Sequence, residues 1–330
     1  MPFPVSKSFA EGLQMDILPQ HDKINGVYRA TKPITITNVD ENLEPYTNGK
    51  NTVITHGDGM DSTAIALLFP DFLLVHSTNK DDPSKIKTFI NENLKNKSYI
   101  INSNCKELCH PKGFTTFTNI FLIPLILSTD LNIKNICCGE ILGSSCLSNG
   151  RKYFPQFNTK RRNRWMRFYN HIGINIFSPI AGCSELITSK IVHTHNLSNK
   201  VLFCEANQGN PCFKCVKCLR KILELKPHGY NHDFNSFNKQ FIIKNLSKRP
   251  LYFSHIFIHT IKNNQDIPHY LKKLIKDIQH IDTSLFNKIY SKSFIYFPND
   301  IAEKIINKLT KYAKIMNKEE EKYLENWNIT

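Results

Sequence analysis

One stretch of the chain decides the fold: Asn51-Thr-Val-Ile-Thr-His-Gly-Asp-Gly-Met-Asp-Ser-Thr-Ala-Ile-Ala-Leu-Leu68. Val53 and Ile54 lie in a run without polar alternation, which is typical of a strand buried on both faces of a parallel sheet. Gly57 and Gly59 then allow a tight turn, and a helical pattern follows. The stretch therefore predicts a strand, a loop and a helix.

The loop has the composition of an anion-binding site. Asp61, Ser62 and Thr63 stand where the helix begins, and the unpaired N–H groups and positive dipole end of a helix favour an anion there. Two common phosphate motifs do not fit, because Ser62 replaces the third glycine of the dinucleotide fingerprint and the Walker Gly-Lys-Ser/Thr is absent. An ordinary strand-to-helix turn stays an alternative.

Strand and helix patterns alternate from this loop onward. We expect further strands at Phe72–His76, Ser98–Asn102, Lys134–Gly139 and Ile174–Pro179, and helices at Pro83–Asn96, Phe117–Ser128 and Ser184–His195. This alternation predicts an α/β fold with a doubly wound parallel sheet, which binds ligands beyond the carboxyl ends of its strands. His76, Ser77, Thr78 and Gly139 end two of these strands, so they should lie beside the glycine loop.

The composition indicates a folded protein, with 41% hydrophobic and 22% charged residues. The net charge of +15 raises affinity for polyanions without identifying one, and a solvated basic surface explains it equally well. The first residues lack the apolar core of a signal peptide, and the most lipophilic run, 120–127, is too short to span a bilayer. We therefore expect a cytoplasmic protein without membrane segments, whose ten cysteines are metal ligands or buried thiols.

A cysteine array gives the strongest signal in the sequence. Cys204, Cys212, Cys215 and Cys218 are spaced as C-x7-C-x2-C-x2-C. Four thiolates at this spacing can close tetrahedrally on one Zn²⁺. Such a closed site leaves no position for a substrate, so we expect a structural zinc ion.

A basic and aromatic stretch covers residues 149–169 and contains no acidic residue. It could follow a nucleic-acid backbone while stacking bases, or clamp the phosphates of one nucleotide. A helix with aromatic side chains in the core and arginines in solvent explains the same pattern. The three interpretations stay open.

The sequence divides into three parts. Residues 1–50 form an N-terminal extension with short strands expected at Val27–Ala30 and Ile34–Val39, 51–226 form the α/β domain with the cysteine array, and 227–330 form a mainly helical region. In the last part, helical spacing is shown by two apolar sets, Leu271, Leu274, Ile275 and Ile278, and Ile301, Ile305, Leu309 and Tyr312. These stripes are more typical of core packing than of a cofactor site.

Several motifs together resemble one enzyme family. The segment Gly57-Asp58-Gly59-Met60-Asp61-Ser62 resembles the pyrophosphate loop Ser-Gly-Gly-x-Asp-Ser of the N-type ATP pyrophosphatases. This resemblance implies an adenine nucleotide alpha hydrolase-like fold. Its pairing with the cysteine array is similar to 7-cyano-7-deazaguanine synthases, over residues 51–226. Ser178-Pro-Ile-Ala-Gly-Cys-Ser-Glu-Leu-Ile and Asn119-Ile-Phe-Leu resemble two further segments of that family.

The resemblance implies an ATP-dependent ligase. Such enzymes adenylate the carboxylate of 7-carboxy-7-deazaguanine, release pyrophosphate and let an amine displace AMP; biosynthetic members then form a nitrile. It implies ATP with Mg²⁺ as cofactors, a small-molecule carboxylate as substrate, a small or protein amine as acceptor, and a place in 7-deazapurine metabolism or antiviral defence. Carried onto this chain, it implies catalytic roles for Asp61 and Ser62, with Asp61 helping to hold Mg²⁺. It also implies nucleotide contacts from Gly57, Asp58, Gly59, Asp61, Ser62, His76, Ser77, Thr78, Gly139, Arg151 and Lys152.

The chain also departs from this family. Asp58 replaces a glycine, which should weaken phosphate binding unless Asp58 helps to hold Mg²⁺. The family's segment Asp-Tyr-Ser-Gly-Tyr-Pro-Asp-Cys-Arg is not reproduced after Gly139, so we expect a different acceptor. The alternatives are a non-catalytic, zinc-braced nucleotide- or nucleic-acid-binding protein, and a tRNA-modifying enzyme that uses Lys160–Arg167. Homodimerisation stays open.

Overall fold

The structure is a computed structural model. It describes residues 48–78, 83–103, 116–155, 169–170, 172–201, 204, 211–228, 236–265 and 267–329, with Asn42 and four N-terminal strands. These strands are β1 (Val5–Ser6), β2 (Gln20–Ile24), β3 (Val27–Lys32) and β4 (Val39–Asp40). β2 pairs antiparallel with β3, and β1 pairs parallel with β4. The strand predicted at Val27–Ala30 is confirmed within β3, whereas most of the one predicted at Ile34–Val39 lies outside the described residues.

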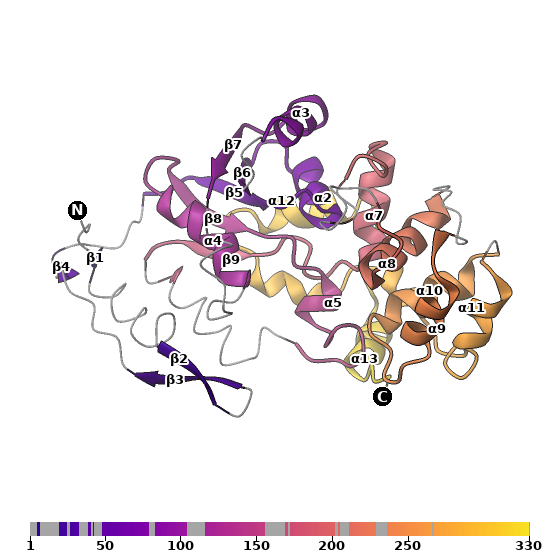
Figure 1. Cartoon of the computed structure of the whole chain (residues 1–330). Coiled ribbons are helices and arrows are strands. Elements are labelled where there is room, and N and C mark those ends of the chain that lie inside the picture. The colour runs from indigo at the N-terminus through magenta and orange to yellow at the C-terminus, as the bar shows by residue number, and fades with distance from the viewer. Residues whose placement is uncertain are drawn as a thin grey trace.

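A five-stranded parallel sheet forms the centre of the α/β part (Figure 1). Its strands are β5 (Asn51–His56), β6 (Leu73–Thr78), β7 (Ser98–Asn102), β8 (Ile133–Cys137) and β9 (Asn175–Phe177). They lie in the order β7-β6-β5-β8-β9, so β5 is central and the order reverses between β5 and β8. The predicted doubly wound parallel sheet is therefore confirmed.

Helices cover both faces of this sheet. α2 (Met60–Leu68) and α7 (Glu185–Thr194) pack with Ile54 in one hydrophobic cluster, while α4 (Thr116–Ile126) packs with Val53 in a second. Val53 and Ile54 are both fully buried, because successive side chains of β5 point to opposite faces. This explains the apolar run without alternation that the sequence shows.

The structure shortens several predicted helices; α12 (Ala302–Leu309), for example, ends before Tyr312 of the predicted stripe. α3 is Ser84–Asn93, and Asn96 does not extend it; its side-chain amide donates to the carbonyls of Phe69 and Phe72 at 2.8 and 2.9 Å. α11 is His269–Leu274, so the prediction of one helical face through Ile278 is wrong in extent. Ile275 and Ile278 are still buried, because the turns after α11 pack on the same core.

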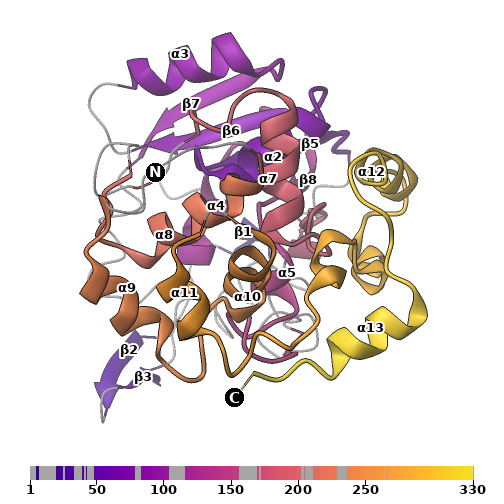
Figure 2. The same cartoon turned by 90° about the vertical axis from the view of Figure 1, so that its right-hand side faces the viewer.

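The region after residue 227 is mainly helical, as predicted. It contains α9 (Lys239–Leu246), α10 (Ser254–Asn263), α11, α12 (Ala302–Leu309) and α13 (Lys318–Glu325), with short 3₁₀ turns at Lys226–His228, Ser284–Asn287 and Ser291–Tyr296. Figure 2 shows α7, α8 (Val216–Leu225) and α10 beside one another, and contacts join α8 to both. One buried cluster runs from Ile54 to Ile329. The boundary at 226 stays a prediction.

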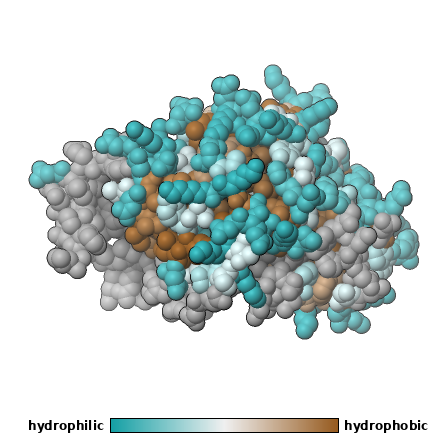
Figure 3. Space-filling model, turned by 90° about the horizontal axis from the view of Figure 1, so that it is seen from above, coloured by the Kyte–Doolittle hydropathy of each residue, from teal (hydrophilic) through white to brown (hydrophobic). Residues whose placement is uncertain are grey.

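The end of the chain returns to the α/β part. Tyr153 N donates to Trp327 O at 2.8 Å, Ile329 N donates to Arg151 O at 2.6 Å, and the Trp327 indole donates to Gly150 O at 2.9 Å. None of the described helices has the length and apolar character that crossing a membrane requires. Hydrophilic residues cover much of the face seen in Figure 3, with hydrophobic ones between them.

Candidate functional site

The glycine loop lies between β5 and α2, at the carboxyl edge of the sheet. The Ser62 hydroxyl closes it, accepting from Gly57 N at 3.2 Å and donating to Gly59 O at 3.3 Å. Thr63 N also donates to Gly59 O, at 3.1 Å, as the first bond of α2. The loop residues predicted to form a phosphate cradle are thus held in one compact turn by Ser62.

Open space lies outside the two loop glycines. Among the described residues, a Cβ atom at Gly57 would meet no heavy atom within 4 Å, and one at Gly59 only the Gly57 carbonyl oxygen at 3.9 Å. Gly57 is exposed, and no described side chain caps the N-terminus of α2. The described part of the chain therefore does not require glycine at these positions for packing, whereas a ligand that approaches the backbone would.

The predicted neighbours of the loop lie at the same edge. A Cβ atom on Gly139 would come within 3.1 Å of Ser62 N and 3.2 Å of Asp61 Cβ, so the segment after β8 packs closely on the first turn of α2 and a side chain there would push against that turn. His76 on β6 pairs in register with His56 on β5. Ser77 and Thr78 complete β6 beyond that pair.

Asp58 turns towards two histidines. Its backbone is left-handed, with φ 57°, and its Oδ1 atom lies 3.2 Å from Nδ1 of His56 and 3.2 Å from Nδ1 of His76. Thr63 Oγ1 lies 3.4 Å from the other ring nitrogen of His56. His56 was not among the predicted site residues; the available signal was a histidine near the end of each of two successive predicted strands.

Asp61 faces α7. Thr188 Oγ1 donates to Asp61 Oδ1 at 2.8 Å, and burial together with nearby Glu185 raises the pKa of Asp61. This carboxylate thus already accepts a hydrogen bond from the protein. The role of Asp61 in holding Mg²⁺ stays a prediction.

A buried charge network extends from α7. Glu185 contacts His255 Nε2 at 3.0 Å and Arg220 Nη1 at 3.3 Å, and Arg220 Nε pairs with Glu224 at 2.9 Å. Burial raises the pKa of Glu185, but His255 and Arg220 outweigh it and hold this pKa at about 2. Burial raises the pKa of Glu224 to about 8 against the opposing effect of Arg220. Glu185 therefore stays ionised inside the protein.

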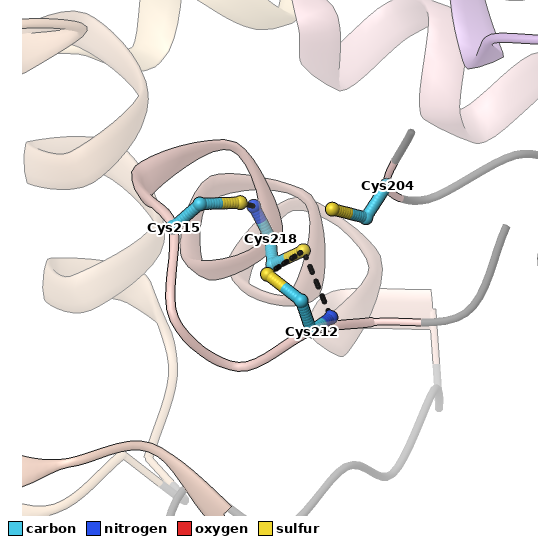
Figure 4. A group of neighbouring side chains, drawn as sticks. All are labelled: Cys204, Cys212, Cys215 and Cys218. Carbon is cyan, nitrogen blue, oxygen red and sulfur yellow. Dashed lines mark hydrogen bonds between the residues drawn. The ribbon is translucent and has the colours of Figure 1, made fainter. Parts of the chain in front are cut away.

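The four array cysteines come together, as predicted, and Figure 4 shows their sulfur atoms converging. All four sulfurs lie within 4.8 Å of one another, and Cys212 Sγ is 3.7 Å from Cys218 Sγ. Although burial raises it, the backbone N–H of Lys214 and the neighbouring thiols lower the pKa of Cys212 to about 7. Four thiols in this arrangement fit a tetrahedral zinc ion.

Local structure fixes two of these ligands. Cys215 caps the N-terminus of α8, where its sulfur accepts from Cys218 N at 3.4 Å, and Cys218 lies in the first turn. Cys204 is buried and comes from a separate segment. Four other cysteines, Cys137, Cys138, Cys146 and Cys183, are buried thiols as expected, while Cys105 and Cys109 lie outside the described residues.

Residues 164–328 match a family described as a family of unknown function, DUF6395. The match covers half of the chain. The chain belongs to the DUF6395 family. No curated protein and no solved structure matches it.

The DUF6395 region contains the cysteine cluster and the buried charge network, whereas the glycine loop lies before it. Thr188 connects the two, because it belongs to the DUF6395 region and contacts Asp61 in α2. The family match therefore covers the half of the chain that packs against the glycine loop, and it assigns this half no activity.

Two of the predicted nucleotide contacts, Arg151 and Lys152, lie against C-terminal residues. The Arg151 guanidinium stacks on the Tyr252 ring at 4.5 Å and donates to Ser148 O at 3.2 Å. Lys152 is exposed, and its backbone forms an isolated antiparallel β-bridge with Asn328. No contact among the described residues joins either side chain to the glycine loop, so their role at a nucleotide stays a prediction. Lys160–Arg167, in the basic stretch, lies outside the described residues.

Proposed function

We propose that this chain binds ATP at the glycine loop and uses it to activate a carboxylate for amide formation, as 7-cyano-7-deazaguanine synthases do. The observation that carries the proposal is the space that the described residues leave open at Gly57 and Gly59, beside the N-terminus of α2, which none of their side chains caps. This loop follows the central strand where the strand order reverses, which is where open parallel sheets bind ligands.

The chemistry follows from what this loop offers. Backbone N–H groups and the positive end of α2 would hold the β- and γ-phosphates. A substrate carboxylate would attack the α-phosphorus, pyrophosphate would leave, and an amine would then displace AMP from the acyl adenylate. Mg²⁺, when bound, would offset the phosphate charge. Ser62 would keep the loop closed around the phosphates, because it bonds both Gly57 and Gly59.

A second candidate function is nucleotide binding without catalysis. It is favoured by the two loop carboxylates, because Asp58 lies against His56 and His76 while Asp61 accepts from Thr188. With both carboxylates directed at protein groups, Mg²⁺ would lack these two candidate ligands. The zinc-braced half of the chain would then serve as a scaffold.

One experiment tests the first candidate and separates it from the second. Calorimetry measures ATP binding by the full chain, and a coupled assay measures pyrophosphate release with 7-carboxy-7-deazaguanine and ammonia. In Gly57→Ala the added methyl group has room in the protein but would meet the phosphates, so we expect ATP affinity to fall about tenfold or more. Thr310→Ala, at the exposed end of α12, is the control.

The outcomes are distinct. Pyrophosphate release that depends on the acid supports the ligase. ATP binding that Gly57→Ala weakens, without pyrophosphate release for any acid supplied, supports the non-catalytic function. Equal ATP affinity in wild type, Gly57→Ala and Thr310→Ala would show that the loop is not the phosphate site.

A further inference from the structure

Three metal-ligand side chains converge beside the glycine loop, apart from the cysteine cluster. His56 comes from the end of β5, Asp58 from the loop and His76 from β6. One ligand atom from each, a ring nitrogen of each histidine and a carboxylate oxygen of Asp58, all lie within 4.8 Å of one another. The register pairing of His56 with His76 brings the two rings to a centroid distance of 5.7 Å.

We propose that His56, Asp58 and His76 bind a divalent transition-metal ion such as Zn²⁺. Imidazole and carboxylate are ligands that zinc and its neighbours accept. In a tetrahedral site with bonds of about 2.1 Å, neighbouring ligand atoms stand about 3.4 Å apart. The two 3.2 Å separations between Asp58 Oδ1 and the Nδ1 atoms are close to that spacing.

The surrounding residues orient these ligands. Thr63 Oγ1 lies 3.4 Å from Nε2 of His56, so Nε2–H can donate to it and leave the Nδ1 lone pair for a metal. The His56 ring also stacks on Phe89. Asp58 keeps a left-handed backbone, uncommon outside glycine, and this conformation belongs to the turn that sets its carboxylate between the two rings.

The site is open on one side. Three protein ligands leave at least one coordination position, unlike the closed four-cysteine cluster. The Asp58 side chain is 16% exposed, and a Cβ atom on the preceding residue, Gly57, would meet no described heavy atom within 4 Å. The ion could therefore accept an oxygen of a bound phosphate or carboxylate. This site does not depend on ATP binding, and it gives His76 a role other than flanking adenine.

The test counts metal ions on the full chain after removal of bound metal, with CoCl₂ as the probe in calorimetry and absorption spectroscopy. Cobalt on thiolates gives charge-transfer absorption, whereas cobalt on imidazole and carboxylate gives only weak d–d bands, so the two sites are read separately. We expect two equivalents in wild type. We expect one in Asp58→Asn, with thiolate absorption unchanged; asparagine tolerates the left-handed backbone at this position.

Further variants complete the test. His76→Gln and His56→Gln should each lose the second equivalent. Loss of an outer-shell partner typically lowers metal affinity by about 10- to 100-fold, and loss of a direct ligand should lower it further. His195→Gln removes an exposed histidine outside the cluster and should keep both equivalents. If one histidine variant does not fold, Asp58→Asn and the other decide.

Two results would overturn the proposal. Wild type could take up only the thiolate-bound equivalent, in which case His56, Asp58 and His76 do not form a metal site. Alternatively, a second equivalent could persist with equal affinity in Asp58→Asn and in a folded histidine variant, which would place it elsewhere. Loss or retention of ATP binding has no bearing on either result, so failure of the proposed function is measured separately.

Discussion

Thr188 Oγ1 donates a 2.8 Å hydrogen bond to Asp61 Oδ1, which ties the first turn of α2 to the buried side of α7. α7 also carries Glu185, which contacts Arg220 of α8 at 3.3 Å. Because Cys215 caps α8, a series of contacts runs from the cysteine cluster to the glycine loop. We therefore expect a substitution at either end to affect the stability of α7 and α8.

Removal of the Thr188 hydroxyl should destabilise the protein. In Thr188→Val the shape of this buried side chain is kept but the half-buried Asp61 carboxylate loses a donor, which costs about 1–3 kcal/mol of the free energy of unfolding. Urea denaturation at pH 7 measures it. Thr188→Ser should retain most of the stability, and Thr194→Val, an exposed position on the same helix, is the control. Equal stability of Thr188→Val and wild type would contradict the prediction.

Removal of a cysteine ligand should release one zinc ion per chain and loosen α8. In Cys215→Ser the N-cap of α8 and a metal ligand change together, so hydrogen exchange should speed up across Val216–Leu225. Metal analysis and hydrogen-exchange mass spectrometry measure the two effects. Cys146→Ala, a buried cysteine outside the cluster, should keep its zinc even if its stability falls. Unchanged zinc in Cys215→Ser would remove the cluster from consideration as a metal site.

The features that are predicted well from the sequence depend on residues that are close together in the chain. The buried β5 run and the close spacing of Cys212, Cys215 and Cys218 are both local, so pattern and ligand chemistry are enough to find them. The extent of α11 was not predictable in the same way. Ile275 and Ile278 keep a helical spacing although they lie in turns, because the core selects for apolar residues in either conformation.

The long-range contacts of the site were not predictable. Glu185 meets Arg220 and His255 across 35 and 70 residues of chain, and periodicity carries no information about which helices adjoin. His56 faces His76 only because of the register between β5 and β6, which tertiary packing sets. From the sequence, Asp58 is expected to weaken phosphate binding. Its contacts with two histidines depend on the strand register, so they could not be predicted.

Acid should destabilise the protein through His228. Its ring stacks on His193 with centroids 4.9 Å apart, and burial, His193 and Lys190 lower its pKa from 6.5 to about 4. Between these values the unfolded chain binds more protons, so the free energy of unfolding falls as pH drops from 6.5 to 4. Because the residue is only half-buried, solvent screening reduces the effect to on the order of 1 kcal/mol.

Urea unfolding at pH 7 and pH 4.5 measures this contribution. His228→Gln should lose less stability than wild type over that interval. Lys190→Gln should give an intermediate result, since removal of its positive charge raises the pKa of His228. The same pH dependence in His228→Gln and wild type would show that His228 does not contribute.

Replacement of Asp58 by glycine should strengthen ATP binding in metal-free protein. Glycine adopts the left-handed backbone without strain, so the loop keeps its shape while a negative charge leaves the phosphate site. A carboxylate about 4 Å from a phosphate opposes binding by on the order of a few kcal/mol in a partly buried site. We therefore expect ATP to bind up to about a hundredfold more tightly. Asn132→Gly, another left-handed position, controls for the backbone change.

Calorimetry of ATP with and without Mg²⁺, on wild type and on Asp58→Gly, decides how Asp58 acts. If Asp58 opposes the phosphates, Asp58→Gly binds more tightly in both conditions, and pyrophosphate release could then be measured in the variant. If Asp58 instead holds a cation for ATP, the wild type gains affinity from Mg²⁺ and Asp58→Gly does not, because a bound cation reverses the sign of the local charge. The same affinity in all four titrations would mean that Asp58 does not face the phosphates, and that the glycine loop holds ATP elsewhere or not at all.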